Sequence, residues 1–311
     1  MIRFGIAIGA YSSGVPGARE LTELARTAEA VGFDSVQVGD HIQWHAPILE
    51  ATTVLATFAA ATSRVRIASD VIILPLRDPV LIAKTVASLD VLSGGRMIFG
   101  VGVGGDHPDE YRAMRVPLSE RGSRANEMLH IVRGLFANER FSYAGRHFTI
   151  EDVAISPRPL QRSLPIWVGG TSEPALRRAA RYGDGWIAAF TSERKFTRLA
   201  EQTRGFLLEA GRSPEGFTWG AFLFSNMGPD AAQAKAAGAE YISRVYRLPG
   251  EEIMSRFGIA GPVEAGADRV RTFIEAGADY VVLGPVCGYR EWPRQLAAYG
   301  ELIAKLGAGR Q

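Results

Sequence analysis

The sequence predicts an α/β fold, a (β/α)8 TIM barrel with insertions after its fourth and seventh strands. Short β-branched runs alternate with longer helical patterns along the chain, which is typical of a parallel sheet covered on both faces. Residues 28–39 and 273–284 also share one pattern of helix, glycine, acidic turn, strand and glycine. A recurring unit and eight strands favour a closed barrel, and an open doubly wound sheet is the alternative.

The strand candidates follow one another from the first residues to the last third of the chain, and each is a short run rich in β-branched or aromatic residues. They are residues 2–8, 35–38, 65–73, 97–101, 165–168, 185–189, 217–224 and 279–283. Between them, apolar residues recur at helical spacing, as in Leu21, Leu24 and Ala28 before Gly32. We expect such glycines to end helices and lead into strands.

Three stretches exceed what a barrel needs and mix glycine, proline and charge. Residues 107–126 and 141–163 follow strand 4, before and after its helix, and residues 225–266 follow strand 7. Loops after barrel strands carry the chemistry of this fold, so we expect the insertions to build or cover the active site. We expect one domain over residues 1–311.

Composition narrows the class of protein. The 311 residues are 47% hydrophobic and 22% charged, and 35 Lys and Arg against 33 Asp and Glu leave a net charge of +2. This balance gives no large basic field, so neither nucleic acid nor a membrane is an expected partner. The one cysteine, Cys287, cannot form a disulfide within the chain, and no run is long and apolar enough for a signal or membrane segment. We therefore expect a cytoplasmic protein.

Candidates for acid–base chemistry stand at the end of strand 2, where Asp40 and His41 are followed by Trp44. A barrel places such groups at C-terminal strand ends, and histidine titrates near neutral pH. Trp44 is suited to wall a planar ring. The alternative is that Asp40 caps a turn and His41 is a structural hydrogen-bond donor.

Strand 3 contains a charged residue, Asp70, in an otherwise apolar run. An ionised carboxylate inside a barrel costs free energy unless it is paired or lies at an accessible strand end. Asp70 therefore predicts a bulge or the mouth of the site. Alternatively, strand 3 ends there and Val71 begins a loop.

A glycine-rich turn follows strand 4. Gly100, Gly102 and Gly105 spell G-x-G-x-x-G, but Asp106 and Pro108 follow where a dinucleotide site requires a helix to begin. We expect these glycines to bring backbone close to a flat ligand instead.

A second glycine-rich turn follows strand 5, where Gly169, Gly170, Thr171 and Ser172 lead into a helical pattern. Free backbone N–H groups at a helix start are suited to an anion such as a phosphate. The alternative is an ordinary, well-capped turn. The arginines of the following helix, Arg177, Arg178 and Arg181, are either further attraction for negative charge or a solvated face.

Metal binding and nucleophilic catalysis find little support. The histidines are scattered without the spacing of metal ligands, so no metal is expected; they are His41, His45, His107, His130 and His147. Cys287 follows strand 8, and we expect it to line the barrel mouth without acting as a nucleophile.

Several segments together resemble the bacterial luciferase-like monooxygenase family, and within it the branch that uses the deazaflavin coenzyme F420. They are AEAVGFDSVQVGDH (28–41), RVRIASDVIILPLRDPVLIAKTVASLDVLSGGRMIFGVGVGG (64–105), DEYRAMRVPLSERGSRANE (109–127), PIWVGGTSEPALRRAARYGDGW (165–186) and GADYVVLGP (277–285). The resemblance covers nearly the whole chain, and LDVLSGGR and GDGW are specific to the family.

This resemblance implies a barrel that binds a flavin or deazaflavin ring at its C-terminal face, with the phosphate near strands 5 and 6. In relatives, a bulge in strand 3 with a non-proline cis peptide presses on the central ring, and it matches Asp70-Val71. In the deazaflavin branch, the residue matching Asp40 touches the ring system and the one matching His41 neighbours the hydride-carrying carbon. Sugar-phosphate dehydrogenases of that branch carry a glutamate where Gly105 stands, which argues against their activity here.

The resulting hypothesis is an enzyme, a coenzyme F420-dependent oxidoreductase that transfers a hydride between the deazaflavin and a small organic substrate. His41 is the expected proton donor or acceptor, with Trp44 beside it. The expected cofactor-binding residues are Asp40, Asp70, Val71, Gly102, Val103, Gly104, Gly105, Gly169, Gly170, Thr171 and Ser172.

Two alternatives remain open. One is an FMN-dependent monooxygenase that uses reduced flavin and O2 and needs a flavin reductase partner, and the other is a non-catalytic flavin-binding relative. The family resemblance also implies a homodimer.

Overall fold

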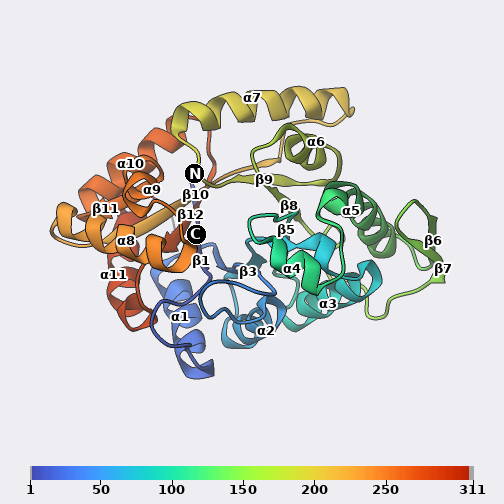
Figure 1. Ribbon diagram of the computed structural model, residues 1–311, viewed down its shortest axis with the longest axis horizontal. Coiled ribbons are helices and arrows are strands. Elements are labelled where there is room, and N and C mark those ends of the chain that lie inside the picture. The colour runs from blue at the N-terminus through green and yellow to red at the C-terminus, as the bar shows by residue number, and fades with distance from the viewer. Residues whose placement is uncertain (1, 308–311) are drawn as a thin grey trace.

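The computed structural model describes residues 2–307, and Met1 and residues 308–311 lie outside the described part (Figure 1). Within it, eight parallel strands close into a barrel, because β1 pairs with β2 and β12, and β10 pairs with β9 and β12. The strands are β1 (Arg3–Ile8), β2 (Ser35–Val38), β3 (Arg66–Ser69), β5 (Met97–Gly102), β8 (Ile166–Gly169), β9 (Gly185–Ala188), β10 (Thr218–Met227) and β12 (Tyr280–Pro285). The barrel prediction is confirmed over the open sheet.

A helix follows each barrel strand, and these helices form the outer layer in the same order (Figure 1). They are α1 (Ala18–Val31), α2 (Ala51–Ala61), α3 (Pro79–Leu92), α5 (Arg121–Ala137), α6 (Glu173–Tyr182), α7 (Glu193–Glu209), α10 (Val263–Glu275) and α11 (Trp292–Lys305). Consecutive helices pack against one another around the barrel, and α11 packs against α1. Gly32 and Gly277, both at φ +98°, follow α1 and α10 in the left-handed conformation that glycine adopts easily.

The acidic turn shared by the two similar segments ties neighbouring strands together at their N-terminal ends. In both segments, and also at Asp184, an aspartate just before one strand accepts a hydrogen bond from a backbone N–H near the start of the adjacent strand. These bonds join Asp34 to Phe4 (2.7 Å), Asp184 to Ile166 (2.9 Å) and Asp279 to Trp219 (2.9 Å). The repeated motif therefore stabilises the end of the barrel that lies opposite the expected site.

Two predicted strands differ from their observed bounds for local reasons. Strand 3 is split into β3 and a short β4 (Ile72–Ile73), with Asp70 and Val71 between them, and β4 pairs with β5. Strand β10 extends to Met227 because an additional strand, β11 (Gly258–Gly261), pairs in parallel with its last residues.

The insertions after strands 4 and 7 are confirmed. The first contains α4 (Pro108–Ala113) and a 3-10 turn, η2 (Leu118–Glu120); the second contains α8 (Ala231–Tyr246), α9 (Gly250–Phe257) and β11. Short 3-10 turns also follow β4 and β12, at η1 (Leu74–Leu76) and η3 (Tyr289–Glu291). Both insertions leave the C-terminal ends of barrel strands.

The stretch 141–163 does not cover the site. It forms an antiparallel hairpin of β6 (Phe141–Ala144) and β7 (Thr149–Val153) at the periphery, against α5 (Figure 1). Phe141 packs on Gly134 of α5, and Glu127 of the same helix accepts from the N–H of His147 at 3.0 Å. Our expectation was wrong here because this stretch leaves a helix, so it departs from the opposite end of the barrel.

Buried side chains from the barrel strands form a cluster of their own. They are Ala7, Ala68, Ile98, Trp167, Ile187, Tyr280 and Val282. Glycines take over toward the C-terminal ends, which leaves room for a ligand there. Within residues 2–307, none of the helices is both long and apolar enough to cross a membrane. The single domain expected over residues 1–311 stays a prediction.

Candidate active site

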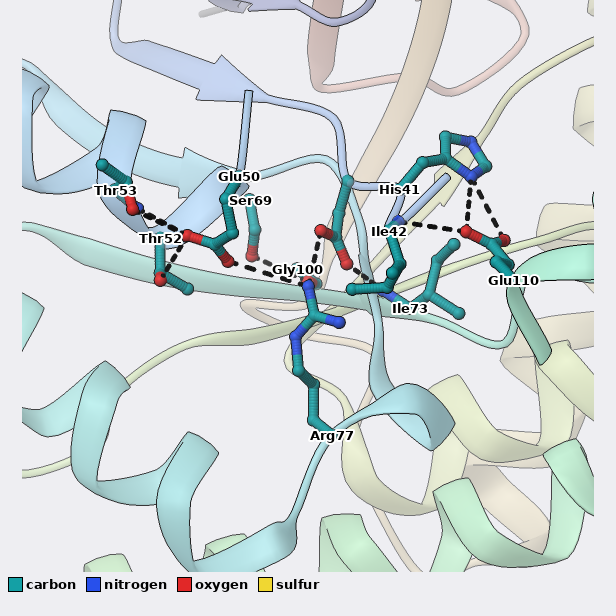
Figure 2. A network of polar contacts seen from close by, with 11 residues as sticks. His41, Ile42, Glu50, Thr52, Thr53, Ser69, Ile73, Arg77, Gly100 and Glu110 are labelled. Atoms are coloured by element: carbon teal, nitrogen blue, oxygen red, sulfur yellow. Dashed lines mark hydrogen bonds and ion pairs between the residues drawn. The ribbon is translucent and has the colours of Figure 1, made fainter. Parts of the chain in front are cut away.

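His41 lies just past the end of β2 and pairs with Glu110 of α4. The Nδ1 atom of His41 is 3.2 Å from both carboxylate oxygens of Glu110, and the backbone N–H of Ile42 donates to the same carboxylate at 3.1 Å (Figure 2). The Glu110 side chain is fully enclosed, whereas 20% of the His41 side chain is exposed. The carboxylate therefore fixes the imidazole through Nδ1 and leaves Nε2 available for a reacting group.

Trp44 stacks on His41 and ties this loop to the insertion after β10. The two rings lie with centroids 4.0 Å apart and planes inclined by 23°. The indole N–H donates to the backbone oxygen of Val245 in α8 at 2.9 Å, and the ring of Tyr246 meets the indole edge-on at 6.1 Å. We define His41, Trp44 and Glu110 as the side-chain half of the barrel mouth.

Asp40 is committed to partners within the protein. One carboxylate oxygen accepts from the N–H of Ile73 at 3.0 Å, and the other is 2.7 Å from the Arg77 guanidinium, which also lies 3.7 Å from Glu50 (Figure 2). The side chain is fully enclosed, and burial raises the pKa of Asp40 against the opposing charge of Arg77. We expected Asp40 against the cofactor ring, and its enclosed carboxylate instead holds the strand that follows the bulge.

Asp70 and Val71 form the bulge between β3 and β4, and the peptide bond that joins them is cis, as the family resemblance implies. Ser69 fixes the start of the bulge by donating from its hydroxyl to the backbone oxygen of Gly100 at 2.8 Å. A Cβ added at Gly102 would lie 2.6 Å from a methyl group of Val71, and one at Gly169 would lie 3.1 Å from the other. Val71 therefore needs both glycines beside it.

The carboxyl of Asp70 has an oxygen, Oδ2, that is shielded from solvent and has no hydrogen-bond partner within residues 2–307. Burial raises the pKa of Asp70 to about 7. A shielded polar atom without a partner is uncommon in folded proteins and indicates a place where a ligand completes the hydrogen bonding.

Backbone lines the side of the mouth formed by β5. After β5, Gly104 and Gly105 adopt φ of +52° and +119°, and Tyr111 of α4 donates from its hydroxyl to the backbone oxygen of Val103. A Cβ at Gly105 would lie 3.2 Å from the Nε of Arg121, so a guanidinium packs directly on this turn.

The turn after β8 continues this surface. Gly170 has φ +123°, and the indole N–H of Trp186 donates to its backbone oxygen at 2.7 Å. Ser172 is the N-cap of α6 without a capping bond from its side chain. Its backbone oxygen accepts from the N–H of Ala175 at 2.9 Å, and Pro174 has no N–H, so within residues 2–307 the N–H of Glu173 is the one in the first turn that donates no hydrogen bond. We define residues 102–105 and 169–172 as the glycine half of the mouth.

The arginines of α6 are engaged elsewhere. Arg177 pairs with Glu173 and Glu209 at 2.8 and 3.1 Å, and the buried Arg178 donates to Asn126 at 2.8 Å. These two side chains therefore join α6 to its neighbouring helices, in contrast to the attraction for a ligand that we considered.

Sequence reasoning missed Glu110, which completes the pair with His41 across 69 residues of chain. The available signal was an acidic residue close behind a helix-starting proline within the first insertion. It also missed Tyr246, whose hydroxyl reaches the end of β1, 3.4 Å from where a Cβ of Gly9 would lie. Neither residue stands in a recognisable spacing, because both come from insertions that meet the barrel only in three dimensions.

Three other kinds of candidate site were a reactive cysteine, a metal centre and a surface groove. Cys287 is buried, and burial raises its pKa to about 12, which disfavours the thiolate that a nucleophile requires. Its place at the barrel mouth stays a prediction. In the described part of the chain, no group of three or more His, Cys, Asp or Glu side chains is arranged to hold a metal ion. Two surface grooves lie away from His41. One, of about 410 Å³, lies between α1 and α11, and the other, of about 190 Å³, lies beside α5.

Comparison with known families decides the identity of the chain. Residues 2–252 match the family described as luciferase-like monooxygenase. The chain belongs to this family. Membership in the luciferase-like family confirms the resemblance of the sequence segments and makes the protein an oxidoreductase.

Individual relatives include both dehydrogenases and a monooxygenase. An F420-dependent glucose-6-phosphate dehydrogenase of Nakamurella multipartita is 28% identical and matches 97% of this chain and 95% of its own length. Monooxygenase RslO1 from Streptomyces bottropensis superposes with a TM-score of 0.87 at 22% identity, over 99% of this chain and 100% of its own. An F420-dependent secondary alcohol dehydrogenase, in complex with an F420-acetone adduct, gives a TM-score of 0.84 at 20% identity over 98% and 99%. The solved structures establish the shared fold.

Proposed function

We propose that this protein is a coenzyme F420-dependent oxidoreductase that transfers a hydride between the deazaflavin and a small organic substrate. The observation that carries the proposal is the pair of His41 and Glu110, which faces a mouth whose other half is bare backbone. The dehydrogenase from Nakamurella multipartita and the secondary alcohol dehydrogenase are both F420-dependent, which supports F420 as the cofactor.

The residues of the mouth fit a flat ring with a phosphate. Val71 and the glycines beside it present a surface without protruding side chains, and the unpartnered Oδ2 of Asp70 offers a hydrogen-bonding group at its edge. The start of α6 offers the backbone N–H of Glu173 and the hydroxyl of Ser172 for the phosphate. When bound, the deazaflavin supplies the hydride donor or acceptor of the reaction.

His41 moves the proton that accompanies the hydride. Glu110 accepts from the Nδ1–H, which leaves Nε2 as the atom that takes a proton from a substrate hydroxyl or returns it to a carbonyl. Enclosure of Glu110 preserves this tautomer, and the stacked Trp44 keeps the imidazole in one plane. Asp40 acts as a positioning residue, because it joins Arg77 to the strand after the bulge.

The proposal extends to the cellular compartment, the oligomeric state and the reaction partner. We propose that the protein acts in the cytoplasm, where the lone thiol of Cys287 stays reduced, and that it forms a homodimer. Its partner in the reaction is a small molecule, and a flavin reductase would be required only for an FMN enzyme.

Titration of the purified protein with coenzyme F420 and, separately, with FMN tests the proposal through cofactor fluorescence. We expect saturable binding of F420 and much weaker binding of FMN. Tight FMN binding without F420 binding would overturn the proposal in favour of the monooxygenase. Binding of a cofactor without turnover of any alcohol or carbonyl compound would favour a non-catalytic relative.

A further inference from the structure

Two histidines lie close to Trp44, and Arg247 lies near enough for its charge to act on one of them. His45 comes from the loop after β2, His107 precedes α4, and Arg247 ends α8. The ring centroids of His45 and His107 are 4.7 Å apart, and those of Trp44 and His45 are 5.0 Å apart. We call His45, His107 and Arg247 the basic cluster.

The basic cluster lacks an acidic partner within the described residues. His107 is 8% exposed, and its Nδ1 is shielded from solvent without a hydrogen-bond partner in residues 2–307. Arg247 takes part in none of the ion pairs found in that part of the chain. Asp109, whose charge acts on His45, is already paired with Arg112 at 2.7 Å. The donors of the cluster are therefore available to a ligand.

The charges around His45 are mostly positive. Burial and then the positive charge of Arg247, His107 and His41 lower the pKa of His45, and only Asp109 opposes them. An anion placed among these groups would relieve their mutual repulsion, and it would raise the pKa of His45.

We propose that His45, His107 and Arg247 bind an anionic group of the substrate, a carboxylate or a phosphate. Imidazole N–H groups and a guanidinium form charge-assisted hydrogen bonds with both kinds of anion. This inference rests on the proposed function, because it takes the substrate to react beside His41.

The geometry limits the size of that substrate. His41 and His45 both lie against Trp44, at centroid separations of 4.0 and 5.0 Å, so the anion site is close to the reacting end. The substrate class is therefore a small hydroxy or carbonyl compound whose anionic group lies a few bonds from the carbon that exchanges the hydride. Trp44 would cover the apolar stretch between them.

The direct test is titration of the full-length protein, without coenzyme, with inorganic phosphate and with acetate, followed by NMR of the histidine rings. We expect saturable shifts of the His45 and His107 signals, a rise in the pKa of His45 at saturation, and tighter binding as pH falls. Because a charge-assisted hydrogen bond contributes about 1.5–3 kcal/mol, Arg247→Gln should weaken binding by about tenfold or more. Arg181→Gln, which removes a cation of α6 outside the cluster, is the matched control and should bind as wild type does.

A second arm separates the substrate from the coenzyme as the source of the anion. Binding of F420 should be equal in wild type and Arg247→Gln. Absence of phosphate and acetate shifts in wild type, or equal binding by Arg247→Gln, overturns the inference, and so does a loss confined to F420 binding. Failure of wild type to bind F420 would instead overturn the proposed function, so the two failures are distinguishable.

Discussion

On the side of β2 the barrel mouth is lined by side chains that stack or form hydrogen bonds, whereas on the side of β5 and β8 it is lined by backbone. In the side-chain half, Glu110 reaches His41 from an insertion and Trp44 is anchored to α8. In the glycine half, positions such as Gly102 have no room for even a methyl group beside Val71. The difference matches the division of work in the proposed function, in which one half performs proton transfer and the other supports a flat cofactor.

Replacing His41 should have the largest effect, because it removes the proton-transferring group of the side-chain half. We expect His41→Asn to lower turnover by about 10²–10⁴-fold while F420 affinity stays unchanged. Glu110→Gln, which leaves the imidazole in place but alters its partner, should give a smaller loss. Steady-state kinetics and cofactor titration check both, and full turnover by cofactor-loaded His41→Asn would remove its catalytic role.

Breaking the ion pair of Arg77 and Asp40 should lower the free energy of unfolding. Arg77→Met leaves an enclosed carboxylate without its counter-charge, and we expect a loss of about 3–5 kcal/mol in the free energy of unfolding. The folded-state pKa of Asp40 is already raised and would rise further, so the loss should grow as pH increases. Urea denaturation at pH 5 and pH 8 measures it.

The double variant Asp40→Asn with Arg77→Met is the control for this pair. It removes the carboxylate as well as its partner, so it should recover part of the lost stability at pH 8. Equal stability of wild type and Arg77→Met would contradict the buried ion pair.

Substitution in the glycine half should weaken cofactor binding without touching the proton-transferring residues. In Gly102→Ala the new methyl group would lie 2.6 Å from Val71, whose β-branched side chain cannot easily turn away. We expect F420 affinity to fall by about tenfold or more, measured by fluorescence titration. A methyl group at Gly205 in α7 would meet open space, so Gly205→Ala should bind F420 as wild type does. Its free energy of unfolding should rise by up to about 1 kcal/mol, because alanine favours a helix over glycine.

The smallest expected effect concerns Asp70, which lies in the bulge between β3 and β4. Its folded-state pKa of about 7 exceeds the ordinary 3.8, so the folded protein holds this proton more tightly, and stability should fall as pH rises from about 4 to 7. Asp70→Asn removes the titrating carboxyl, so it should abolish the part of that decline that comes from Asp70. Asp268→Asn, at an exposed carboxyl in α10, should keep the wild-type pH profile of urea denaturation.

Local patterns sufficed for the barrel because each strand and helix carries its own signal. The apolar run of β2 and the glycine after α1 are read without knowledge of the rest of the chain. Position at a strand end then predicted His41 and the turn at Gly169, because parallel strands of a barrel all end at one face. The hairpin at residues 141–153 was misplaced because its length resembles that of the true insertions.

The sequence by itself determined the order of strands and helices and the family, and it singled out His41 at the end of β2. Tertiary structure decided that Glu110 is the partner of His41, that Asp40 faces Arg77, and that Tyr246 reaches the end of β1. It also brought His45 and His107 beside Trp44, with Arg247 near enough for its charge to act on His45. The physical reason is that strand and helix formation depends on periodicity within a few residues, whereas hydrogen bonds and charges at the barrel mouth join insertions that are far apart in the chain.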